Sequence, residues 1–71
     1  MAFDYSKLRG KIREAFGTQE NFANAVGLSM TSISAKLNNK VEWSQREINK
    51  ASEILKIPDN EVFAYFFTEK V

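Results

Sequence analysis

The chain has 71 residues, of which 44% are hydrophobic and 27% are charged; its formal net charge is +1, and it contains no cysteine and no histidine. A chain of this length forms one domain, residues 1–71, without a disulfide or a structural zinc site, and no apolar run is long enough to span a membrane. Because the side chains that most often act as catalytic bases and nucleophiles are also missing, the composition argues against an enzyme.

Two closely spaced helices are predicted at the start of the chain. The first begins at Asp4 or Ser6 and ends at Phe16. Its apolar residues recur on one face: Leu8, Ile12, Ala15 and Phe16. Thr18 is a good N-cap for the second helix, which closes at Gly27. Its buried face is predicted to consist of Phe22, Ala23 and Val26.

The third helix is predicted to begin after the capping residue Ser29 and to bury Ile33 and Leu37, which lie four residues apart, with Met30 on the same side. The opposite face of this helix consists of small and polar side chains. The pair Asn38-Asn39 marks its end. The third helix therefore has one side for the core and one side that faces away from it.

The fourth helix has the clearest start signal. Ser44 and Glu47 match the S-x-x-E capping box, in which each side chain satisfies a backbone N–H group of the other residue. Trp43 and Ile48 occupy the flanking hydrophobic-staple positions. Helical periodicity then continues to Lys56.

A fifth helix is predicted from Pro58 to Phe67, and the residues from Thr68 onward are expected to fray. Its apolar stripe has two interpretations. It packs on the core of the domain, or it forms a dimer interface, because exposed aromatic stripes are typical of self-associating surfaces. We expect both, with a homodimer interface formed by Phe63, Phe66 and Phe67.

Residues 18–38 contain four positions with a distinctive spacing: Gln19, Ala23, Gly27 and Ile33. This spacing resembles the helix-turn-helix of the phage repressor and Cro family. Over roughly residues 5–67 the chain is similar to the small repressors and Cro-like regulators of temperate phages of Gram-positive bacteria. The resemblance implies an all-α, compact five-helix, lambda-repressor-like DNA-binding domain. One position departs from the family pattern, because the second core position of the third helix is Lys36 and the apolar residue is Leu37.

The resemblance also implies that the third helix lies in the major groove of double-stranded DNA while the second crosses the backbone. The residues implied to read bases are Ser29, Met30, Thr31, Ser34, Ala35 and Asn38. Those implied to contact phosphates are Gln19, Lys36, Asn39 and Lys40. No Arg or Gln lies on the base-reading face to pair bidentately with guanine or adenine. We therefore expect modest specificity per half-site, supplemented by dimerisation or DNA shape.

The leading hypothesis is a sequence-specific transcriptional regulator, a repressor or Cro-like protein of a temperate phage or prophage, that binds a two-fold related operator as a homodimer. One alternative keeps the fold: an antitoxin of a toxin–antitoxin pair, whose C-terminal aromatics hold the toxin. Another is a helical protein-interaction module without DNA activity. We expect a cytoplasmic protein with no cofactor, metal or small-molecule ligand, since the N-terminus lacks the pattern of a signal peptide.

Overall fold

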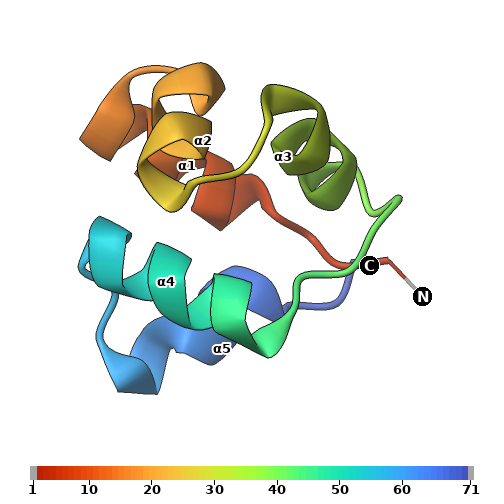
Figure 1. Cartoon of the computed structure of the whole chain (residues 1–71). Coiled ribbons are helices and arrows are strands. Elements are labelled where there is room, and N and C mark those ends of the chain that lie inside the picture. Colours follow the sequence, from red (N-terminus) through yellow and green to blue (C-terminus); the bar gives the residue numbers. More distant parts are fainter. Residues whose placement is uncertain (1, 71) are drawn as a thin grey trace.

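Five α-helices follow one another along residues 2–70, the part of the chain that this computed structural model describes (Figure 1). They are α1 (Ser6–Phe16), α2 (Gln19–Val26), α3 (Met30–Leu37), α4 (Gln45–Leu55) and α5 (Val62–Phe66). The predicted all-α, five-helix architecture is confirmed. Among residues 2–70, none of the helices has the length and hydropathy of a membrane span.

Hydroxyl side chains begin three of these helices, at Thr18, Ser29 and Ser44. The predicted capping box is present at α4, where Ser44 Oγ accepts from the backbone N–H of Glu47 at 3.1 Å and the Glu47 carboxylate accepts from the N–H of Ser44 at 2.8 Å. α2 ends at Gly27, whose φ of 86° lies in the left-handed region that glycine adopts without strain. These helix ends are therefore set by hydrogen bonds and backbone conformations of residues within a few positions of each boundary.

The C-terminal helix is shorter than predicted. The chain leaves α4 through Lys56, which has a left-handed φ of 58°, and makes a 3-10 turn at Asp59–Glu61. The N–H of Glu61 donates to the carbonyl of Pro58 at 2.9 Å, which is the tighter i to i+3 hydrogen bond of that turn. The element predicted over residues 58–67 is therefore α-helical for only five residues.

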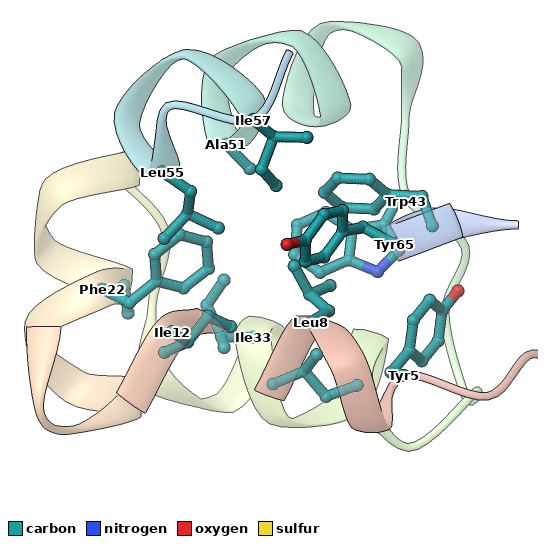
Figure 2. Packing of buried hydrophobic residues seen from close by; sticks show 13 residues of the cluster. Tyr5, Leu8, Ile12, Phe22, Ile33, Trp43, Ala51, Leu55, Ile57 and Tyr65 are labelled. Atoms are coloured by element: carbon teal, nitrogen blue, oxygen red, sulfur yellow. The ribbon is translucent and has the colours of Figure 1, made fainter. Parts of the chain in front are cut away.

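A buried cluster of side chains joins all five helices (Figure 2). Its members are Tyr5, Leu8, Ile12, Phe22, Ala23, Ile33, Leu37, Trp43, Ala51, Leu55, Ile57, Tyr65 and Phe66. One prediction for α1 is wrong, because Ala15 is exposed. The last turn of α1 instead reaches the core through the ring of Phe16, whose centroid lies 5.7 Å from that of Phe22.

The two ends of the described chain pair with each other beside the end of α3 (Figure 1). The N–H of Asp4 donates to the carbonyl of Thr68 at 2.7 Å, and the N–H of Lys70 donates to the carbonyl of Ala2 at 3.0 Å. The expectation that the chain frays from Thr68 onward is therefore wrong as far as residue 70, and residue 71 lies outside the described residues. Helical periodicity does not reveal this pairing, because it joins opposite ends of the sequence.

Lys36 occupies a core position of α3 and is only 7% exposed. Its ammonium lies 2.9 Å from Oε1 of Glu47 on α4 and donates a hydrogen bond to the carbonyl of Glu42 at 3.1 Å. It also lies 6.0 Å from the centroid of the Trp43 ring. The prediction that Lys36 contacts phosphate is therefore wrong, because its charge is turned inward and joins α3 to α4.

The ion pair makes the stability of the domain depend on pH. Partial burial raises the pKa of Glu47, but hydrogen bonds from the Ser44 backbone and from Lys36, together with the charge of Lys36, outweigh this and hold the pKa below its ordinary value of 4.5. Because the folded pKa lies below the unfolded one, the unfolded chain binds more protons in the interval between them. The stabilisation is therefore present above pH 4.5 and is lost as the pH falls through the folded pKa.

Glu47→Gln tests the ion pair, because it removes the negative charge and leaves the Lys36 ammonium in the core without an anion. We expect the free energy of unfolding at pH 7 to fall by about 2 kcal/mol and its decline towards pH 3 to become flatter. Urea unfolding over a pH series measures both effects. Glu53→Gln, at an exposed position of α4, is the matched control. Equal effects of the two substitutions would contradict this account.

Candidate nucleic-acid interface

The side of α3 that faces away from the core forms a shallow depression in the surface. Ile33 and Leu37, which are 0% and 3% exposed, hold the opposite side of the helix in the core. The depression is lined by Met30, Thr31, Ser34, Ala35, Asn38 and Lys40. The placement of Met30 on the same side as Ile33 and Leu37 is wrong, because its side chain is 43% exposed and lies in this depression. Five of the six residues predicted to read bases therefore lie together, next to one of the predicted phosphate contacts.

Ser29, the sixth predicted base-reading residue, serves the helix instead. Its hydroxyl oxygen accepts a hydrogen bond from the backbone N–H of Ser32 at 3.1 Å, and its hydroxyl hydrogen is donated to Ser32 Oγ at 3.0 Å. The cap thus engages this side chain as both donor and acceptor. Ser29 does not line the depression. It could bind a base only by breaking one of its two hydrogen bonds to Ser32.

Asn38 is held in place by an arginine from α1 that the sequence analysis missed. Nη2 of Arg9 donates to Asn38 Oδ1 at 2.9 Å and to the carbonyl of Leu37 at 3.0 Å. The Asn38 amide nitrogen in turn donates to Ser34 Oγ at 3.4 Å. Bidentate pairing with adenine uses both polar atoms of an Asn side chain. Asn38 can therefore pair in this way only if it leaves Arg9.

Gln19 lies at the first position of α2, beside two arginines of α1. A second surface depression is lined by Arg9, Gly10, Ile12, Arg13, Gly17, Thr18 and Gln19. Both arginines thus line the depression that contains Gln19. The guanidinium of Arg9 is already engaged by Leu37 and Asn38, so Arg13 is the better candidate for a phosphate, with which guanidinium pairs well. Arg9 and Arg13 are four residues apart, so they share one face of α1. That spacing was the signal in the sequence that could have identified them.

Of the two residues that follow α3, Lys40 lines the α3 depression and Asn39 does not. Both polar atoms of the Asn39 amide bond to the backbone of Phe3, at 2.8 and 2.9 Å. The Asn39 side chain therefore holds the N-terminal segment in place, and its amide is not available for the predicted phosphate contact. Lys40 and Gln19 are the two predicted phosphate contacts whose side chains are not tied to another part of the protein by a hydrogen bond among the described residues.

The C-terminal aromatics divide into core and surface. Phe66 is 1% exposed and packs edge-on against Trp43, with ring centroids 5.2 Å apart, so its prediction as a dimer contact is wrong. Phe63 is 70% exposed and Phe67 37% exposed. Together with Phe3, whose ring meets that of Phe67 edge-on at 6.0 Å, they form what we call the aromatic surface. This surface, without Phe66, is the part of the predicted interface that another molecule can reach.

Comparison with known proteins identifies the family. Residues 1–69 match the model of a family described as a protein of unknown function, DUF739. The chain belongs to this family. It is also similar to a solved structure, the solution structure of the modulator of repression (MOR) of the temperate bacteriophage TP901-1 from Lactococcus lactis. The two share 51% sequence identity over 100% of this chain and 96% of the other, with a TM-score of 0.84. No curated protein matches.

These findings refine the family expected from the sequence. The similarity to a regulator of a temperate phage is confirmed, and so is the five-helix fold. The family shown is DUF739, however, and the narrower likeness to repressors and Cro proteins stays a prediction.

The division of the aromatics can be tested through stability. Phe66→Ala is expected to lower the free energy of unfolding by about 3–5 kcal/mol, because it leaves a cavity in the core. Phe63→Ala is expected to change it by no more than about 0.5 kcal/mol, because this ring is mostly in water. Urea unfolding of the two variants measures the difference. Similar losses would show that Phe63 is part of the core of the protein in solution.

Proposed function

We propose that this chain is a regulatory protein of a temperate phage that modulates repression. The observation that carries the proposal is the 51% identity to the TP901-1 modulator of repression across the whole chain. At this similarity and at a TM-score of 0.84, the exposed surfaces of the two proteins are built on the same framework. Two surfaces of this chain are candidates for its action: the α3 depression and the aromatic surface.

The first mode of action is operator binding through α3, with the helix in the major groove. The exposed small and polar side chains of α3 support this mode. The hydroxyls of Thr31 and Ser34 hydrogen-bond to several bases, and Met30 and Ala35 suit thymine methyl groups. Lys40 borders the depression and supplies positive charge for phosphates. In this mode a homodimer, formed through the aromatic surface, binds two half-sites about 34 Å apart.

In the second mode, the aromatic surface binds another protein that takes part in repression, such as the repressor of the same phage. The exposure of Phe63 and Phe67 favours it, because large aromatic side chains that are free in the monomer are typical anchors of protein interfaces. The composition of α3 also supports it. The α3 depression contains no Arg or Gln for bidentate contacts to bases, and the charge of Lys36 is buried in the core. Few side chains are therefore left on this surface for base and phosphate contacts.

A selection from random-sequence duplex DNA tests the first mode. Enrichment of a palindromic motif is expected for a dimer, whereas a single half-site would keep DNA binding and remove the dimer. The logarithm of the affinity for the selected duplex should fall with the logarithm of salt concentration by about 0.9 per neutralised phosphate. No enrichment, even at low salt, would reject the first mode.

Thr31→Glu places a negative charge in the α3 depression. We expect it to weaken binding to the selected duplex by about a hundredfold, because the carboxylate faces phosphates. Its circular dichroism should match that of the wild type, since Thr31 is exposed. Asn49→Glu, at an exposed position of α4, adds the same charge elsewhere and is the control. A folded Thr31→Glu protein with undiminished affinity would contradict the assignment of α3 as the reading face.

Calorimetric titration with the purified repressor of the same phage tests the second mode. Phe63→Ala is expected to weaken this binding at least about tenfold, because an exposed aromatic anchor is lost. Thr31→Glu is the matched variant on the other surface and should bind as the wild type does. Absence of binding, or binding that neither Phe63→Ala nor Phe67→Ala alters, would reject the second mode.

A further inference from the structure

Asn39 ties the end of α3 to the N-terminal segment. It comes just after the helix and has a left-handed backbone, with φ of 64°. Its Oδ1 accepts from the N–H of Phe3 at 2.8 Å, and its Nδ2 donates to the carbonyl of Phe3 at 2.9 Å. A single side chain thus satisfies both backbone groups of Phe3, as a neighbouring strand does.

Phe3 is at the same time part of the aromatic surface. Its ring meets the ring of Phe67 at 89° with centroids 6.0 Å apart, and the ring of Phe67 lies 5.7 Å from that of Phe63. On its other side the Phe3 segment pairs with the C-terminal segment, at the antiparallel bridge to Glu69. A displacement of the Phe67 ring therefore acts directly on the residue whose backbone Asn39 holds.

The turn that carries Asn39 also borders the α3 depression. Its two neighbours in sequence, Asn38 and Lys40, both line that depression. The N–H of Lys40 donates to the carbonyl of Ala35 at 2.9 Å, so the turn is hydrogen-bonded to the body of α3. The contacts therefore form a continuous path from the aromatic rings to α3.

We propose that Asn39 is a positioning residue that couples the aromatic surface to the C-terminal end of α3. Contacts made at Phe63 and Phe67 shift Phe3, and the two hydrogen bonds of the Asn39 amide transmit the shift to residues 38–40. The use of this coupling in regulation rests on the proposed function. The coupling itself is a property of the free protein, and it links the two candidate surfaces whichever of them binds.

Asn39→Gly removes the amide and keeps the left-handed backbone, which glycine adopts freely. Lys56→Gly is the matched control, because Lys56 is the other non-glycine residue with a positive φ, 58°, among those described. In Asn39→Gly the nuclear Overhauser contacts between the rings of Phe3 and Phe67 are expected to disappear. Amide hydrogen exchange at Asp4 and Lys70 should accelerate about tenfold. Lys56→Gly should change neither.

The coupling is read by a double-mutant comparison of amide chemical shifts in the free protein. Phe67→Ala is expected to shift the amides of residues 38–40 when Asn39 is present and to leave them unchanged in the Asn39→Gly background. Equal shifts in the two backgrounds would overturn the proposal. So would an Asn39→Gly protein that keeps the ring contacts and the slow exchange at both ends of the chain.

Loss of the core in Asn39→Gly would appear as loss of slow exchange at Phe22 and Ile33. Asn39→Asp then decides, because its carboxylate keeps the acceptor for the N–H of Phe3 and lacks the donor. A weakened transmission of the Phe67→Ala shifts supports the coupling, and full transmission overturns it. Since no DNA or protein partner is added, failure of the coupling is distinguishable from failure of the proposed function.

Discussion

Burial of the inner side of α3 is the contact on which the fold and the α3 surface both depend. Ile33 is fully buried, and Leu37 is 3% exposed. They share the core with Phe22 and Ala23 of α2, where the small alanine side chain suits close helix packing. A chain of 71 residues without cysteine has no disulfide to supplement this core. The same packing that stabilises the domain therefore fixes the direction in which the outer side of α3 points.

Lys36 shows how the core and the surface of α3 compete for the same residue. Its ammonium is paired with Glu47, whose carboxylate also completes the cap of α4. One carboxylate thus fixes the start of α4 and its connection to α3, and desolvation of the lysine is offset by the pair and by the carbonyl of Glu42. Because the ammonium of Lys36 lies in the core, α3 does not present this positive charge to solvent. The surface of α3 is therefore less suited to binding phosphate.

The sequence was sufficient for features that depend on neighbouring residues and insufficient for those that join distant ones. Helix starts such as Ser44, and the turn at Gly27, were predicted because their chemistry acts within a few residues. Helical periodicity placed Thr31, Ala35 and Asn38 on the outer side of α3 with Ser34 at its edge, but it did not place Met30 there. The Asn39 bonds to Phe3 span 36 positions, and no local pattern encodes them. Periodicity could not separate Phe66 from Phe63 and Phe67 either, because residues three and four apart share one face of a helix.

We propose that this small domain changes repression through surfaces held on a fixed core. The test is a reporter strain that carries the repressor and operator of the phage that encodes this chain. Expression of the wild-type chain is expected to change the output of the repressed promoter. Thr31→Glu in the α3 depression or Phe63→Ala in the aromatic surface, present at the same level in the cell, is expected to lose that effect. Unchanged promoter output when the folded wild-type chain accumulates would contradict the account.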